Sequence, residues 1–435
     1  MQSHYKAHRS ILTSFRFLIY AFLAPVLIVA PLWASGWTLS RAVRRGLRVQ
    51  AAVASSREDL RAASDLARGA RANRLPELFL RGASIWTQGR DGQPLYVAAN
   101  GTREVIGEIA VGVPLYAPEL RALSRLARDR ADLARSELRL ARLQVASRIV
   151  NAWFRLALAE NHVAIWHQTV AYDRSLYERT RRAYRAGASA RLNVVQTRLL
   201  LIEARARYAQ SRTAETTAKR ALNMELGLPA SASISVLWPA KPYVPSPLRQ
   251  LWRNAVRFQP LIRVARRRIL QGRSEVRVQR SATLPAVQGY VAYGVDTATA
   301  PEARDLGWQA GVDLSLPLLG FGRYRERLAA AHAHLSALRQ AKNALVLRIR
   351  QRINRDYGVF RRALESSRRS AEVAREARRV YRMTLHGFRN GALNALVLSQ
   401  AQRDLIQAEL AGANARIEER MAGVQLLLDE GRLPR

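Results

Sequence analysis

The chain has 435 residues, 49% of them hydrophobic, and a net charge of +38 that comes almost entirely from arginine. It contains no cysteine, which excludes a disulfide framework, a thiolate metal site and a catalytic thiol. The arginines are spread along the whole chain at helical spacing, without a basic block or a zinc-finger pattern. The charge therefore does not indicate a nucleic-acid-binding protein.

The N-terminal region has the order of a secretory signal peptide. Basic residues precede an apolar run over 17–33, and small residues follow at 34–36. The run is only about 17 residues long and contains Pro25 and Pro31, so an uncleaved membrane anchor is the less favoured alternative. We therefore expect a signal peptide over residues 1–35.

The rest of the chain is predicted to consist of two similar structural repeats, 36–230 and 231–435. Residues 184–188, Tyr-Arg-Ala-Gly-Ala, return as Phe-Arg-Asn-Gly-Ala at 388–392, which is 204 positions later. The same offset pairs Trp153 with Tyr357, Gln196 with Gln400, Leu201 with Leu405 and Gly227 with Gly431. Each half is predicted to contain a helix, a strand, a loop, a strand, a long helix, a turn and a helix.

Alternation of side-chain type predicts two strands in each half. One face of these strands is apolar and the other is small or polar, which is typical of a strand between lipid and water but also of a half-buried soluble sheet. Polar, glycine-rich loops are expected at 88–103 and 296–304. The apolar faces are Ile109, Val111 and Val113; Val287, Gly289, Val291 and Tyr293; and Val312, Leu314 and Leu316.

Four strands cannot close a barrel, and an open sheet edge in lipid would leave backbone groups without hydrogen bonds. If the strands lie in a membrane, several chains must therefore contribute. Three chains would supply twelve strands, enough for a hollow barrel.

The helices are predicted to be unusually long. The segment 119–185 contains neither proline nor glycine, and as a helix it would measure roughly 100 Å. Leu126, Leu133 and Leu140 recur every seven residues, as in a coiled coil. The segment 325–386 has the same character. Such lengths are typical of a rod or a tunnel wall and not of a compact enzyme.

Enzyme and metal motifs are missing from the sequence. There is no Walker loop, no Gly-x-Ser-x-Gly and no His-Glu-x-x-His, and the segment 320–322, Gly-Phe-Gly, is predicted to be a turn from a strand into a helix. Neither His332 with His334 nor His162 with His167 has a spacing that shares one helix face. We expect no catalytic residues, no metal site and no cofactor.

Both halves share one further order of motifs. A strand ends in apolar-Pro-apolar (113–115 and 316–318), and a long helix, an aromatic-x-x-Gly turn and a last helix follow. The last helix ends at Leu-Gly-Leu-Pro (226–229) or at its relic (431–434). In this order and its duplication the chain resembles the outer-membrane efflux family of TolC-like proteins.

The resemblance implies a mainly α-helical homotrimer with a membrane β-barrel. Four strands per chain would form a twelve-stranded barrel in outer-membrane lipid, and long antiparallel coiled-coil helices would form an α-barrel across the periplasm. The implied function is a passive exit duct of a tripartite efflux or type I secretion system. Its partners would be an inner-membrane pump and a periplasmic adaptor (membrane fusion) protein, with no nucleic acid.

The resemblance also implies which residues meet the adaptor. The docking tips would be Tyr184, Arg185, Ala186, Gly187, Ala188 and Ser189, and Phe388, Arg389, Asn390, Gly391, Ala392 and Leu393. Family members often carry an acidic residue six positions after the tip glycine, at the periplasmic entrance, where this chain has Asn193 and Val397. That departure predicts an anion-tolerant or weakly selective entrance.

Two other functions compete with an exit duct. A periplasmic coiled-coil adaptor or scaffold would share the long helices but would need a lipoyl-like or sandwich domain, which the sequence does not indicate. A basic nucleic-acid-binding coiled coil is disfavoured by the signal peptide and the strands.

Overall fold

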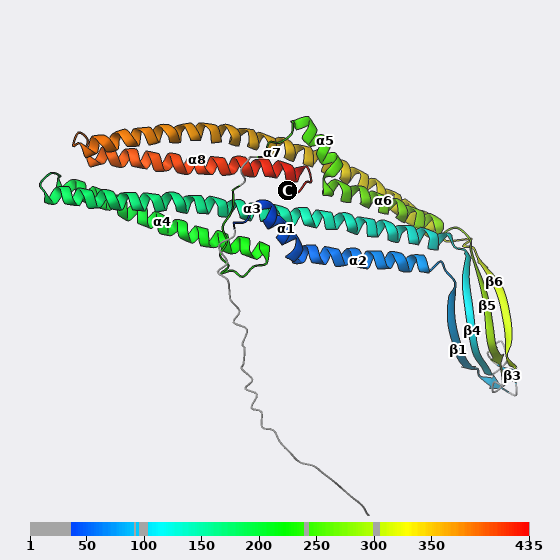
Figure 1. Ribbon diagram of the computed structural model, residues 1–435. Coiled ribbons are helices and arrows are strands. Elements are labelled where there is room, and N and C mark those ends of the chain that lie inside the picture. The colour runs from blue at the N-terminus through cyan, green and yellow to red at the C-terminus, as the bar shows by residue number, and fades with distance from the viewer. Residues whose placement is uncertain (1–35, 91–92, 95–102, 239–242, 299–304, 435) are drawn as a thin grey trace, which may run out of the picture. The chain divides into compact units, whose positions relative to one another are not determined.

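The computed structural model describes residues 36–90, 93–94, 103–238, 243–298 and 305–434, and the elements below belong to one compact unit, Gly36–Arg435 (Figure 1). The predicted signal peptide lies outside the described residues. The elements of the first half are α1 (Leu39–Val49), α2 (Ala51–Ala72), β1 (Glu77–Trp86), β2 (Gly89–Arg90), β3 (Gln93–Pro94), β4 (Arg103–Tyr116), α3 (Pro118–Arg185) and α4 (Arg191–Leu226). Those of the second half are α5 (Leu248–Phe258), α6 (Pro260–Ser281), β5 (Ala286–Thr297), β6 (Gly307–Ser315), α7 (Arg323–Arg389) and α8 (Ala395–Asp429).

The two long helices and the four main strands appear where the sequence predicts them. The turn at 320–322 is also confirmed, because Gly322 precedes α7 with φ +86°. The small β2–β3 hairpin is a difference, since the sequence predicts only a loop over 88–103. Most of that loop and residues 299–304 lie outside the described part of the chain.

The first helix of each half is broken where one helix was expected. Gln50 and Gln259 have extended backbones at the breaks between α1 and α2 and between α5 and α6. Each glutamine donates from Nε2 to a backbone carbonyl at the end of its half's last helix, Gln50 to Glu225 at 2.8 Å and Gln259 to Asp429 at 2.9 Å. These contacts between distant segments stabilise the breaks.

The four main strands form one antiparallel sheet in the order β1-β4-β5-β6. Its register confirms the predicted faces, because Val291 on β5 lies between Val111 on β4 and Ala310 on β6. The apolar face includes Leu78, Leu80, Trp86, Ile109, Val291, Tyr293, Trp308, Val312 and Leu314, all strongly exposed.

The other face of the sheet is polar. Glu108 is nearly buried, yet its carboxylate accepts from Arg81 at 3.3 Å and from Gln309 at 3.2 Å. These residues come from β4, β1 and β6, so the polar network crosses the sheet. The sheet thus presents hydrocarbon on one side and hydrogen-bonded polar groups on the other.

The helices pack side by side, and α3 is the central helix that contacts most of the others (Figure 1). Nearer the sheet, α3 packs against α2 and α6, and α6 packs against α7; farther away, α3 packs against α4 and α8, and α8 packs against α7. The α2 and α4 helices therefore lie on one flank and α7 on the other. Among the described residues, no helix combines the length and the hydropathy needed to cross a membrane.

The main hydrophobic core lies at the middle of α3. Trp153 is fully buried and donates from Nε1 to the carbonyl of Trp37 at 2.9 Å. Gly46 on α1 lies so close to Ile149 that any added Cβ would overlap that side chain. Burial of each such large side chain contributes about 1.5–3 kcal/mol, so this core fixes α1 against α3.

Candidate functional site

Each hairpin of long helices ends in the same type of turn. We call residues 184–189 the first tip and residues 388–393 the second tip. Gly187 has φ +74° and Gly391 has φ +73°. Ala188 N–H donates to Ala183 O at 2.8 Å, and the equivalent bond joins Ala392 to Gly387 at 2.9 Å. Both turns are therefore Schellman motifs, in which a left-handed glycine ends a helix.

The predicted entrance residues are each held within their own turn. Val397 N–H donates to Asn394 Oδ1 at 3.1 Å, and Asn394 is thereby the N-cap of α8. Asn193 donates from Nδ2 to Ser189 Oγ at 3.3 Å, and α4, whose N-cap residue is Ala190, has no side-chain cap. Among the described residues, no hydrogen bond joins Asn193 to Val397.

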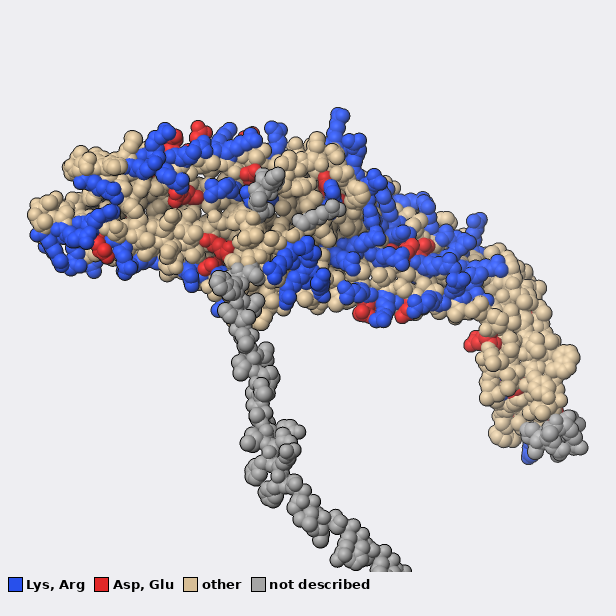
Figure 2. Space-filling view, viewed as in Figure 1, with Lys and Arg blue, Asp and Glu red and all other residues tan. Residues whose placement is uncertain are grey.

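Most of the predicted tip residues are exposed, and the two tips differ in charge. Around the first tip the exposed arginines are Arg181, Arg182, Arg185 and Arg191, whereas Leu385, His386 and Ala395 stand at three of the four equivalent positions of the second tip. Figure 2 shows Lys and Arg covering much of the helices, while the visible face of the sheet carries few charges. Ser189 and Phe388 are only partly exposed, and Phe388 packs inward against a buried cluster.

Substitution of Gly187 is expected to destabilise the first tip according to how well the new residue accepts positive φ. A Cβ at this position would meet no atom within 4 Å, so the cost is conformational and not steric crowding. We expect Gly187→Val to cost about 1–2 kcal/mol and Gly187→Asn clearly less, because asparagine visits the left-handed region. Amide hydrogen exchange at residues 180–192 would measure this, and equal exchange in both variants would contradict it.

The two hairpins touch near their tips through a mixed apolar and polar contact, which we call the hairpin seam. Leu176 on α3 packs with Tyr381 on α7 and with Leu398 and Ala401 on α8. The ring of Tyr172 meets the ring of Tyr381 edge-on at 5.4 Å, and beside them Gln402 Oε1 is buried without a hydrogen-bond partner among the described residues. The seam is therefore less well satisfied than an ordinary core.

Polar side chains join α3 to α8 along the same contact. Gln402 donates from Nε2 to Asp173 Oδ1. Farther from the tips, His162 Nε2 lies 2.8 Å from Asn414 Oδ1. Sequence reasoning missed these pairs, although the spacing of Thr169, Asp173, Leu176 and Thr180 on α3 is a partly polar heptad stripe, and such a stripe fixes register at a cost in stability.

Asp173 is a buried carboxyl group, only 2% exposed. Burial raises its pKa to about 6, although the hydrogen bond from Gln402 favours the ionised form, and the charge of Glu203 raises the pKa further. Ionised Asp173 is therefore poorly compensated at neutral pH.

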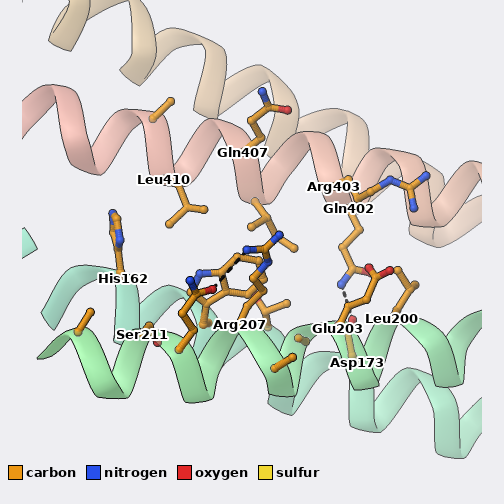
Figure 3. Close-up of a pocket in the computed structure, with 18 of the residues that line it drawn as sticks. His162, Asp173, Leu200, Glu203, Arg207, Ser211, Gln402, Arg403, Gln407 and Leu410 are labelled. Carbon is orange, nitrogen blue, oxygen red and sulfur yellow. Dashed lines mark hydrogen bonds between the residues drawn. The ribbon is translucent and has the colours of Figure 1, made fainter. Parts of the chain in front are cut away.

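A groove of about 1040 Å³ lies between α3, α4 and α8 (Figure 3). His162 lies near one end of it and the Asp173–Gln402 bond near the other. Its lining includes the apolar side chains of Leu200 and Leu410 and the charged side chains of Glu203 and Arg207. No group of three or more His, Asp or Glu side chains in the described part of the chain could hold a metal ion.

The comparisons with known proteins agree with this architecture. A family profile described as "Outer membrane efflux protein" matches residues 44–228 and 251–427. The chain is 24% identical over 409 residues to Nodulation protein T of Rhizobium leguminosarum bv. trifolii, covering 86% of this chain and 81% of that protein.

Two solved structures are similar in fold. The outer-membrane channel OprN has a TM-score of 0.77 at 20% identity, covering 90% of this chain and 89% of that one. The outer membrane protein VceC of Vibrio cholerae has a TM-score of 0.77 at 17% identity, covering 91% and 96%.

Proposed function

Since the chain belongs to the outer membrane efflux protein family, we propose that three copies form an exit duct of a tripartite efflux or type I secretion system. The duct conducts substrates passively from an inner-membrane pump across the periplasm and the outer membrane. The family is one of transport proteins, and we propose no catalytic step. The family assignment replaces the alternative of a periplasmic adaptor.

The observation that carries the proposal is the polarity of the sheet. Leu80 and Trp308 project from the apolar face and are 80% and 77% exposed, an arrangement that is costly in water and favourable in lipid. The polar face carries the Arg81–Glu108 ion pair, as expected for the wall of an aqueous lumen.

The free edges of the sheet support a closed ring of copies. The β1 and β6 strands are the edges of the four-stranded sheet, and an unpaired edge is not tolerated in lipid. Pairing of β6 of one copy with β1 of the next removes every edge, and three copies supply twelve strands. Like the sheet with its two edges, the helical part of one copy has two flanks. The α2 and α4 helices form one flank, and α7 forms the other.

We assign the two tips to the periplasmic end, where an adaptor docks. The tips are the ends of the hairpins farthest along α3 and α7 from the sheet, and both present an exposed left-handed glycine turn. Asn193 and Val397 belong to the entrance. Since neither is charged, the entrance is weakly selective or tolerant of anions.

A bilayer experiment tests the duct. The purified full chain is expected to fractionate with the outer membrane, to run as a heat-resistant trimer in detergent and to give stepwise conductance in planar bilayers. Protein unfolded in guanidinium chloride serves as the control. Recovery of a monomer in the periplasmic fraction that gives no conductance steps would contradict the proposal.

A further inference from the structure

The turn between β6 and α7 carries three unusually exposed apolar side chains. Leu318 and Leu319 are each 83% exposed, and Phe321 is 98% exposed. In Figure 1 this turn lies where the helices meet the sheet. Three adjacent apolar side chains of this size are costly in water, so the turn is expected to have an apolar partner.

The backbone of the turn holds the ring of Phe321 outward. Among the described residues, Phe321 is the non-glycine residue with a positive φ, at +42°, and Gly322 follows with φ +86°. A left-handed backbone is a strained conformation for a bulky side chain. The strain is retained at a residue whose ring contacts almost nothing in its own chain, so the position of the ring is not explained by packing within the chain.

The turn continues the apolar face of the sheet. Every second residue from Val312 to Leu318 is apolar, and Leu314 and Leu316 lie between these two. The β6 strand has 9 residues, against 12 in β5 and 14 in β4. At about 3.3 Å per residue and a tilt near 40°, such a strand spans about 23 Å, slightly less than the apolar band of about 25 Å of a membrane barrel. The turn supplies the missing apolar length.

Arginines begin directly beyond the turn. The eight helical residues nearest the sheet in α2, α3, α6 and α7 are 65–72, 118–125, 274–281 and 323–330, and together they hold nine arginines and four acidic residues. Figure 2 shows this change, because the visible face of the sheet carries few charges while Lys and Arg cover much of the helices. The boundary between apolar and basic surface therefore coincides with the boundary between sheet and helices.

Arg323 is the first of these arginines after the turn. Its guanidinium lies 4.8 Å from the centre of the Tyr324 ring, and its Nη2 donates to Tyr324 Oη at 2.9 Å. Among the described residues, no carboxylate pairs with Arg323. Its remaining donors can bind an oxyanion, and a phosphate accepts two parallel hydrogen bonds from a guanidinium.

We propose that the turn enters the acyl region of the periplasmic leaflet of the outer membrane and that Arg323 binds the phosphate of an anionic phospholipid there. We call Leu318, Leu319, Phe321 and Arg323 the lipid anchor. The order of its residues, apolar first and cationic next, is the order of acyl chains and phosphates across one leaflet. The lipid anchor rests on the proposed duct, in which the sheet lies in lipid, and adds a headgroup contact outside the strands.

Spin labelling tests the depth of the turn, and the chain has no native cysteine to interfere. Full-length Phe321→Cys carries a nitroxide in vesicles of phosphatidylethanolamine and phosphatidylglycerol. We expect oxygen to relax this label more than a water-soluble nickel chelate does. Asp313→Cys is the matched control, because Asp313 pairs with Gln288 on the polar face of β6, and there we expect nickel to dominate. A Phe321→Cys label that is open to nickel, or shielded from both reagents as in a protein contact, would overturn the lipid anchor.

A lipid competition tests the headgroup contact. The trimer in phosphatidylcholine vesicles is expected to retain spin-labelled phosphatidylglycerol in preference to spin-labelled phosphatidylcholine. Arg323→Gln is expected to reduce this preference, whereas Arg368→Gln, an exposed position 45 residues farther along α7, is expected to leave it unchanged. An equal preference in the parent protein and Arg323→Gln would overturn the assignment of the phosphate to Arg323.

Phe321→Gly separates lipid contact from folding. Glycine accepts the left-handed backbone without strain, so we expect a yield of heat-resistant trimer in detergent at least equal to that of the parent. We expect fewer phospholipids to remain bound to each trimer in native mass spectrometry, because the ring is lost. Unchanged lipid retention would overturn the role of Phe321.

These outcomes separate the lipid anchor from the duct. Protein that conducts while its Phe321→Cys label is open to nickel would overturn the lipid anchor and leave the duct in place. A label shielded by lipid in a trimer that never conducts would do the opposite.

Discussion

Replacing Val312 with arginine is expected to remove most of the assembled protein from the outer membrane. Val312 lies on the apolar face of β6 and is 66% exposed. An arginine on the lipid face of a membrane strand costs about 2–4 kcal/mol near the bilayer midplane, and a ring of three copies carries the change three times. The yield of heat-resistant trimer in the outer-membrane fraction measures the loss.

Gln309→Arg is the matched control for Val312→Arg. Gln309 lies on the same strand but on the polar face, where its Nε2 donates to Glu108 at 3.2 Å. A guanidinium group can donate to the same carboxylate, so we expect a near-normal trimer yield. If both variants assembled equally well, the apolar face would not be the one that meets lipid.

The sequence was sufficient to predict the elements that depend on local pattern. The period-two alternation of Val287, Val291 and Tyr293 predicted β5 and its apolar face, and the register confirms it. The absence of proline and glycine over 119–185 predicted α3 to within one residue at its start. Both signals are local, because they come from side-chain direction and backbone preference.

Features that depend on distant contacts were not predicted. The extended backbone at Gln50 is stabilised by a carbonyl 175 residues away, so the local sequence pattern did not predict the helix break there. The hairpin seam likewise joins Asp173 to a residue 229 positions away. A heptad pattern predicts that a helix has a contact face, but it does not say which helix covers that face.

The tip and entrance residues remain a prediction drawn from the family resemblance. The structure describes the turns at Gly187 and Gly391, but what docks on them depends on surfaces of other proteins.

Replacing Asp173 with asparagine is expected to stabilise the helical hairpins at neutral pH and to change little near pH 4. Burial raises the pKa of this carboxyl to about 6, whereas an aspartate in an unfolded chain titrates at about 4. The folded state therefore binds the proton more tightly than the unfolded state. Stability from the bound proton is fully present below about pH 4 and is lost as the pH rises to about 6.

Above pH 6 the ionised carboxylate costs at most about 3 kcal/mol, the free energy that corresponds to the pKa shift. The introduced amide avoids this cost and can donate to Gln402 Oε1, which is buried and has no hydrogen-bond partner in the described part of the chain. Thermal unfolding of the detergent-solubilised variant and the parent protein at pH 4.5 and pH 7.5 measures the difference.

Asp404→Asn is the control for Asp173→Asn, because Asp404 is an exposed carboxylate on α8 near the same seam. We expect this change to stay within about 0.5 kcal/mol at both pH values, as for most surface substitutions. If Asp173→Asn gave the same shift at both pH values, the cost of an ionised buried carboxylate would not be its cause. A pH-dependent shift would mean that the contact between α3 and α8 at Asp173 is less stable at pH 7.5 than at pH 4.5.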